Sequence, residues 1–336
     1  MNRTSILALV VLIGLVIVGL LYVNSGTERV ADMSTERQFG YAEVDHIQTI
    51  RIADRKGHDV TLERAGAEAW TVDGRYPANE NAMKNLLQAI RTLDIQSLPA
   101  SAAVPNYIRS LATNGILVQL FDRGGRKLRG YYIGGGDINE TGTVAIVEGS
   151  ENPYIVHIPM WTGNARYRFN LWGDEWRSKV VFEVNPSEIE YLSIDYPKQQ
   201  AKSFKLTAEG SRYFVEPLYN TGQARREVSR GAAERLLARY EKTYLSRYEN
   251  DDLQSITEAR ARLPFATIRL KTRGKDEQVL QIFPKFDQGF TSNTETGEFY
   301  QLNDLQSYRG FLNGGEDWAL FAPEQIDPLL FAYDSF

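Results

Sequence analysis

The sequence predicts an α+β protein in which a single N-terminal transmembrane helix precedes two similar, tandemly repeated units, each a mainly antiparallel sheet with a packed helix. Three observations support this prediction: an apolar run near the N-terminus, a set of alternating strand patterns that occurs twice, and a one-sided helix pattern in each half. The expected parts are a membrane anchor (residues 1–25), a stalk (26–39), a first unit (40–177), a second unit (178–321) and a C-terminal cap (322–336).

The composition restricts the kind of protein that this chain can be. Its 336 residues are 43% hydrophobic and 24% charged, with a formal net charge of -5. This is enough apolar material for two folded units, and it excludes a polybasic nucleic-acid binder. The absence of cysteine excludes disulfides, a thiol nucleophile and zinc–thiolate sites. We therefore expect a folded protein that has no nucleic-acid partner.

The most informative single segment is the apolar run from Ile6 to Val23, which has eighteen residues and no charge. At ~1.5 Å per residue it spans roughly 27 Å as a helix, close to the thickness of a bilayer core. Arg3 precedes it, so residues 6–23 are expected to contact membrane lipid with the N-terminus in the cytoplasm. For a bacterial source this predicts a single-pass inner-membrane protein whose bulk is periplasmic. The alternative is a signal peptide that is cleaved before Gly26.

A repeat determines the architecture of the remaining chain. Residues 44–70 align with residues 185–214, and apolar residues alternate in both, which predicts strands with one buried face. Residues 116–120 match residues 266–270 at an offset of 150. Return strands are expected at residues 131–133 and 281–283, and closing strands at residues 154–158 and 299–302. Connections of hairpin length favour antiparallel sheets over a doubly wound parallel sheet.

One helix is predicted to pack on each sheet. Asn79 and Ser229 are suitable N-cap residues, and apolar residues follow both at helical spacing. The two stripes are Met83, Leu86, Leu87, Ile90 and Leu93, and Ala233, Leu236, Leu237, Tyr240 and Tyr244. Residues 315–318 also repeat the junction at residues 173–176, so the tail is expected to resemble the start of a third unit and to cap the second one.

The candidate interaction surface lies in residues 159–176, at the junction between the two units. Its members are Trp161, Arg166, Tyr167, Arg168, Phe169, Trp172 and Trp176. Aromatic faces beside arginines can hold a sugar ring or a protein partner. The favoured interpretation is instead a core between the units, because Tyr308, Phe311 and Trp318 form a weaker set at the matching place in the second unit. A binding edge is the other interpretation.

We assign no catalytic, cofactor-binding or metal-binding residue and expect no cofactor. The sequence contains no GxSxG, GxxxxGK[ST] or HExxH motif. His46 and His58 could approach each other to bind a metal, but surface histidines are the favoured interpretation. The glycine run at residues 134–136 is expected to form a wide hairpin in preference to a phosphate-binding loop. The pair Asp251-Asp252 is expected to cap a short helix.

The order of these features resembles a known bacterial family. A single membrane helix, a short stalk and repeated units with alternating strands, a tryptophan-containing strand and a Leu-Leu helix are similar to the membrane-anchored family of domain of unknown function 4340, here in two tandem copies. Residues 44–70, 86–87, 132–134 with 154–156, and 182–194 carry the resemblance. It implies an association with ABC-type exporters or gliding-type machinery, and it brings no catalytic residue.

Two functions are expected from these observations. The first is a non-enzymatic, membrane-tethered, extracytoplasmic accessory or scaffold subunit of an envelope complex, whose partner is a membrane or periplasmic protein such as an ABC-type permease. The alternative is a periplasmic binding module for a glycan or glycolipid, for which the aromatic residues of 159–176 and the glycine run would be responsible. An enzyme is a distant third, which a strongly shifted carboxylate in a deep cleft would favour.

Overall fold

The chain forms two compact units, which divide between Arg177 and Ser178. A computed structural model describes residues 37–138, 140–286, 289–292, 299–302 and 305–336. The predicted membrane helix at residues 6–23 lies outside these ranges, as does the stalk as far as residue 36. Among the described residues, no helix has both the length and the apolar character that a membrane span requires.

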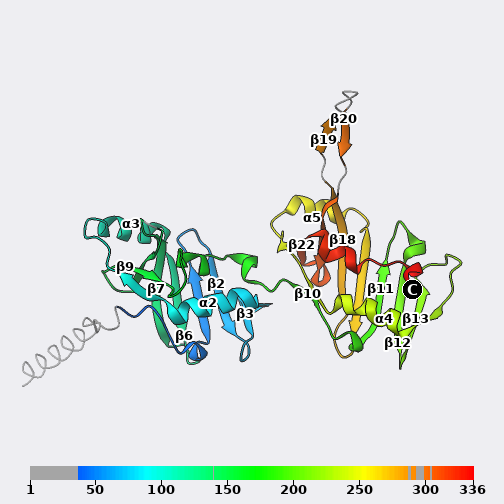
Figure 1. Ribbon diagram of the computed structural model, residues 1–336, viewed down its shortest axis with the longest axis horizontal. Helices are drawn as coiled ribbons and strands as arrows, with labels where there is room; N and C mark the ends of the chain where they lie inside the picture. Colours follow the sequence, from blue (N-terminus) through cyan, green and yellow to red (C-terminus); the bar gives the residue numbers. More distant parts are fainter. Residues whose placement is uncertain (1–36, 139, 287–288, 293–298, 303–304) are drawn as a thin grey trace, which may run out of the picture. The chain divides into compact units, whose positions relative to one another are not determined.

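Each unit contains a nine-stranded sheet, and the two sheets have the same strand order (Figure 1). The first sheet runs β4 (Tyr76–Pro77), β3 (Trp70–Val72), β2 (Asp59–Arg64), β1 (Thr49–Ala53), β6 (Ile116–Phe121), β7 (Lys127–Gly136), β8 (Thr143–Val147), β9 (Tyr154–His157), β5 (Asp94–Ser97). The second runs β14 (Arg226–Val228), β13 (Arg212–Pro217), β12 (Phe204–Glu209), β11 (Ile189–Asp195), β17 (Ala266–Thr272), β18 (Gln278–Phe286), β21 (Leu305–Leu312), β22 (Asp317–Phe321), β16 (Arg247–Tyr248). All neighbours are antiparallel, which confirms an α+β fold of mainly antiparallel sheet.

The pairing register fixes which residues are equivalent in the two sheets. Ile116 pairs with Ile133 in the first unit, and Ala266 pairs with Ile282 in the second. The numbers of equivalent residues therefore differ by 150 between β6 and β17 but by 149 between β7 and β18. Both predicted return strands are present, residues 131–133 in β7 and residues 281–283 in β18, and the difference of one position arises because the first hairpin has one more residue, accommodated at an irregularity after Leu120.

One face of each sheet, which we call the core face, carries the main hydrophobic core. Alternate residues such as Tyr131 and Ile133 in β7, or Leu280 and Ile282 in β18, point into it and are fully buried. The helices α2 (Glu80–Thr92) and α4 (Arg230–Leu237) contribute their apolar stripes to these cores. Both predicted helices are present, but Tyr244 is not part of the second stripe, because α4 ends at residue 237 and Tyr244 is an exposed residue of β15.

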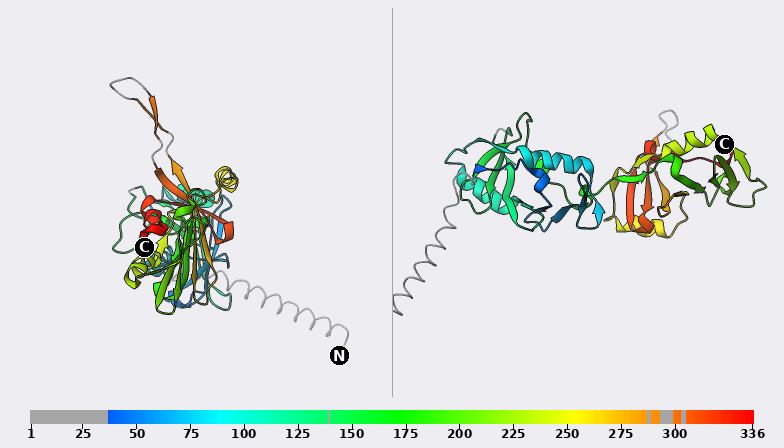
Figure 2. Two further views of the ribbon diagram at one scale, coloured as in Figure 1. Left: turned by 90° about the vertical axis from the view of Figure 1, so that its right-hand side faces the viewer. Right: turned by 90° about the horizontal axis from the view of Figure 1, so that it is seen from below.

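The opposite face of each sheet, which we call the outer face, carries a second helix. This helix is α3 (Val104–Asn114) in the first unit and α5 (Leu253–Arg260) in the second. Figure 2 shows α2 and α3 on opposite sides of the first sheet. Two small hydrophobic clusters lie under these helices and centre on Leu111, Val144 and Ile155, and on Ala259, Phe311 and Trp318. Asp252 caps α5 as predicted, whereas α3 is a helix that the sequence analysis does not predict.

The closing strands of the second sheet differ from the prediction. Phe299–Leu302 is β20, which pairs only with β19 (Gly289–Ser292) in a separate two-stranded hairpin among the described residues. The sheet is instead closed by β21 and β22, which take the places of β8 and β9. The predicted echo between residues 173–176 and 315–318 is therefore wrong, since Gly173–Trp176 is a 3₁₀ helix whereas Trp318 lies in β22.

The C-terminal residues 322–336 pack onto the core of the second unit. They form α6 (Pro323–Ile326) and two 3₁₀ turns, and they bury Ile326, Leu329 and Tyr333. The Tyr240 hydroxyl, on the turn after α4, donates a hydrogen bond of 2.6 Å to the carbonyl of Leu329. A further two-stranded sheet joins β10 (Val180–Glu183) to β15 (Lys242–Tyr244).

Candidate functional site

Two of the seven predicted surface residues, Phe169 and Trp176, belong to the core of the first unit. Both side chains are completely buried there, and the indole Nε1 of Trp176 donates a 2.7 Å hydrogen bond to the carbonyl of Leu171. The Phe169 ring meets Tyr131 edge-on, with 6.1 Å between the ring centroids. The expectation of a core between the units is thus corrected for these rings, because they pack within one unit.

Arg166 attaches the segment to the sheet. Its half-buried guanidinium donates to the carbonyls of Ile133 and Gly134 at 3.0 and 3.3 Å, at the end of β7. Burial lowers the pKa of Arg166, and the nearby charge of Asp54 acts in the opposite direction. The role of Arg166 is therefore to hold the 3₁₀ helix Ala165–Arg168 against β7.

The remaining residues of the segment are at the surface. The Arg168 guanidinium lies 5.1 Å from the ring centroid of Trp161, and Tyr167 is 70% exposed. Trp172 is half-buried and stacks on His58, with 4.9 Å between the centroids. These four side chains, Trp161, Tyr167, Arg168 and Trp172, are the part of the predicted surface that a ligand could reach.

The other candidates from the sequence have local structural roles. His46 lies 3.0 Å from a Glu43 carboxylate oxygen, and His58 lies 2.9 Å from one of Asp54. In the described part of the chain, no group of three or more His, Cys, Asp or Glu side chains could hold a metal ion. Residues 134–136 end strand β7, which pairs antiparallel with β8, and Gly136 lies opposite Thr143, so the expected wide hairpin is confirmed.

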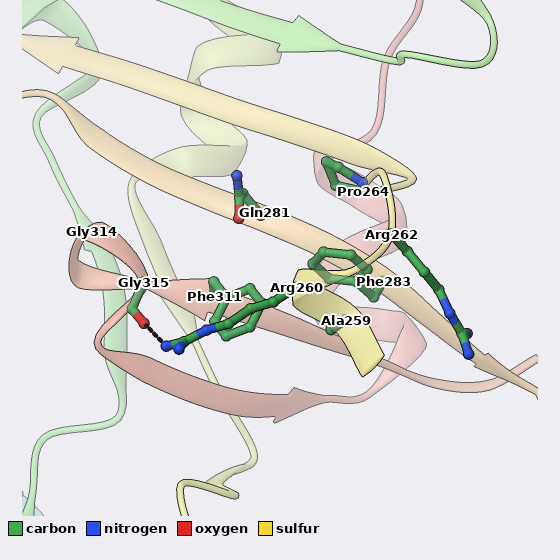
Figure 3. Close-up of a pocket in the computed structure, with 9 residues that line it drawn as sticks. All are labelled: Ala259, Arg260, Arg262, Pro264, Gln281, Phe283, Phe311, Gly314 and Gly315. Atoms are coloured by element: carbon green, nitrogen blue, oxygen red, sulfur yellow. Dashed lines mark hydrogen bonds between the residues drawn. The ribbon is translucent and has the colours of Figure 1, made fainter. Parts of the chain in front are cut away.

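A pocket that the sequence did not reveal lies on the outer face of the second unit, beside the end of α5 (Figure 3). Its volume is about 310 Å³, and we call it the α5 pocket. It is lined by Ala259, Arg260, Arg262, Pro264, Gln281, Phe283, Phe311, Gly314 and Gly315. The helix end, two neighbouring strands and the turn after β21 thus each form one wall.

A second pocket occupies the equivalent place in the first unit, beside α3. This α3 pocket has a volume of about 220 Å³ and is lined by Arg55, Ile108, Leu111, Ala112, Tyr132, Ile146, Val147, Gly149 and Ser150. The pairing registers make Tyr132 equivalent to Gln281, and Ile146 equivalent to Phe311. Both pockets therefore arise from the shared strand order, with a helix end on one side and a glycine-containing turn on the other.

The chemistry of the two pockets differs at the helix end. Leu111 of α3 and Ala259 of α5 are buried against the sheet at equivalent places. The residue that follows in the chain also lines the pocket, and it is Ala112 in the first unit but Arg260 in the second. The Arg260 guanidinium lies 5.6 Å from the centroid of the Phe311 ring and donates to the carbonyl of Gly315 at 3.3 Å. The α5 pocket therefore places a cation beside an aromatic wall.

A charged network supports this side of the second unit. Arg309 occupies on β21 the position that Val144 has on β8, and its guanidinium donates to Glu249 and Asp252 at 2.8 and 2.9 Å. The backbone N–H of Ser255 lowers the pKa of Asp252, burial opposes this effect, and Arg309 adds to the lowering. This network fixes the start of α5 and thereby the helix end that carries Arg260.

Comparison with known proteins gives no relative: no family model, no curated protein and no solved structure matches this chain. The resemblance to the family of domain of unknown function 4340 therefore stays a prediction from the residues that carry it.

Proposed function

We propose that this protein is a non-enzymatic, membrane-tethered accessory or scaffold subunit that binds a partner protein of the bacterial envelope outside the cytoplasm. In this proposal residues 6–23 anchor the chain in the inner membrane, and the two units are tandem copies that lie in the periplasm. The partner is a membrane or periplasmic protein, for which the family resemblance suggests an ABC-type permease or a gliding-type machinery.

The observation that supports this proposal best is the pair of pockets at the same place on two sheets of the same strand order. Tandem copies of one unit present similar surfaces that can engage one partner together, so that the second contact benefits from a high effective concentration. The uncharged run at residues 6–23 supports the tether, because its length and apolar character are those of a membrane-spanning helix.

Recovery of the intact chain from cells in a mild detergent tests the proposal. We expect a membrane protein to be recovered with the full-length chain and a smaller yield with a variant that lacks residues 6–23, because the tether raises the local concentration of the two partners. Recovery of no membrane partner with the full-length chain, after cross-linking in cells, would contradict the proposal.

A second candidate function is glycan or glycolipid binding by the first unit. The observation that favours it is the group of Trp161, Tyr167 and Arg168 at the surface, since aromatic faces with a polar neighbour suit sugar rings. Titration with envelope glycans should change tryptophan fluorescence, and Trp161→Ala should remove the change. An unchanged fluorescence spectrum at saturating glycan would exclude this function.

A further inference from the structure

We propose that the α5 pocket of the second unit binds the carboxy-terminal residue of a partner polypeptide, with Arg260 holding the terminal carboxylate and the two phenylalanines holding an apolar last side chain. This inference rests on the proposed function, because it names the part of the partner that is recognised. The charge, the walls and the size of the pocket support it.

The charge of the pocket is positive, and no acidic side chain lines it in the described part of the second unit. Of the described residues that line it, two are arginines and none is acidic. Arg262 lies 3.5 Å from a Glu258 oxygen and points away from Arg260 (Figure 3). In the described part of the chain, the hydrogen-bond partner of the exposed Arg260 guanidinium is the Gly315 carbonyl, which leaves most of its five N–H donors available. A carboxylate is the group that such a planar fork of donors fits best.

The walls of the pocket are aromatic. Phe283 and Phe311 lie on β18 and β21, with 5.8 Å between their ring centroids, and Phe311 also contacts Trp318 at 4.4 Å. These contacts hold the rings in place, and the half-buried Phe283 keeps part of its surface open to the pocket. An apolar side chain that entered would replace water on this surface and gain from the hydrophobic effect.

The size and geometry favour a chain end over an internal acidic residue. A volume of about 310 Å³ is at the lower limit of ligand pockets and accepts one or two residues. Because the Arg260 guanidinium is 5.6 Å from the Phe311 centroid, the anion and the apolar group must be close together. A carboxy-terminal residue carries both on one Cα atom, whereas an internal aspartate or glutamate uses its side chain for the anion.

A direct test uses the full-length protein in mild detergent and fluorescein-labelled hexapeptides that end in leucine, valine or phenylalanine, each as a free acid and as an amide. We expect fluorescence anisotropy to show saturable binding of a free acid, and amidation to lower the affinity about tenfold, as expected for loss of a charge-assisted hydrogen bond. Arg260→Gln should lower the affinity for the acid by a similar factor and leave the amide unaffected.

Two further variants separate binding from folding. Arg235 is an exposed residue of α4, the helix that packs on the core face of the sheet, on the opposite side from the pocket. Arg235→Gln should therefore leave peptide binding unchanged. Phe283→Ala should weaken the acid and the amide equally, because it removes the apolar wall only. Equal affinity for acids and amides, no binding of any acid, or an Arg260→Gln variant that binds like the wild type would overturn the inference.

The recovery experiment distinguishes this inference from the proposed function. If Arg260→Gln recovers much less of the membrane partner than Arg235→Gln does, the proposed function and the pocket inference both stand. If the wild type and Arg260→Gln recover the partner equally, the proposed function stands and the pocket inference fails. If the wild type recovers no partner, the proposed function fails, whereas the peptide titration still decides whether the pocket binds a carboxy-terminus.

Discussion

The two units share a strand order but differ on their outer faces. In the first unit the buried residues of the helix-covered cluster are aliphatic, namely Leu111, Val144 and Ile155, and Tyr107 and Tyr132 pack against them half-buried. In the second it is aromatic and bordered by charge, with Phe311 and Trp318. The core faces stay alike because strand alternation and burial determine them, as the equivalent Ile133 and Ile282 show. The comparison teaches that the two units diverge on the outer face, where packing restricts the residues less.

The largest expected effect tests whether the two cores are equally necessary. Leu86 of α2 and Leu237 of α4 are almost completely buried in the two cores. Leu86→Ala and Leu237→Ala should each lower the free energy of unfolding of their own unit by about 2–5 kcal/mol, because each leaves a cavity. Hydrogen exchange measured peptide by peptide should show the loss in the altered unit. Unchanged protection in either unit would show that its helix is not part of the core.

Buried tyrosines should respond differently in the two units. The Tyr240 hydroxyl donates to the Leu329 carbonyl, so Tyr240→Phe should lower the stability of the second unit by about 1–2 kcal/mol. The buried Tyr131 hydroxyl has no hydrogen-bond partner among the described residues, and burial strongly raises its pKa. Tyr131→Phe should therefore leave the stability of the first unit unchanged or raise it. Urea unfolding monitored in each unit measures both effects, and a marked loss for Tyr131→Phe would contradict the account.

The two helix starts provide a smaller contrast. The Asn79 side chain accepts hydrogen bonds from the backbone N–H groups of Asn81 and Ala82 at 3.1 and 3.2 Å. Ser229, in front of α4, makes no such side-chain bond. Asn79→Ala should cost about 1 kcal/mol of stability, whereas Ser229→Ala should cost close to nothing. Thermal unfolding of the two variants checks this contrast, and equal losses would show that the two caps are alike.

The smallest expected effect is the pH dependence of the second unit. Since the pKa of Asp252 is lower in the folded chain than its ordinary value of 3.8, ionised Asp252 stabilises α5 above this value. That stabilisation is lost as the pH falls through the folded pKa. Asp252→Asn should therefore be less stable than the wild type at about pH 6, and the difference should disappear in strong acid. A difference in melting temperature that is independent of pH would contradict this role of Asp252.

The sequence predicted those elements whose residues repeat with a clear period. The alternating strands β6 and β17 and the helix α2 were predictable, because their apolar residues face a core on one side only. Helix α3 was missed although Val104, Tyr107, Ile108 and Leu111 recur in it at helical spacing, and Leu111 is the one of these four that is buried. Residues 299–302 are a strand, as predicted, but not a closing strand of the large sheet, because alternation indicates a strand and does not identify the strand with which it pairs.

The candidate site was predicted less well than the fold. The high density of aromatic residues in the segment 159–176 does not indicate which of them are buried. Phe169 and Trp176 are in the core, whereas Tyr167 is exposed. The α5 pocket was missed because strand pairing brings together Phe283 and Phe311, which lie far apart in the chain. The available signal was an aromatic residue at the outward position of each of two adjacent strands.

Site-specific photo-crosslinking in living cells tests the central claim most directly. One crosslinking amino acid replaces Arg262, at the exposed border of the α5 pocket, and another replaces Ile108, at the border of the equivalent α3 pocket. The account predicts that positions 262 and 108 both form crosslinks to one membrane or periplasmic protein. No crosslink from position 262, or a crosslink from position 108 alone, would contradict it.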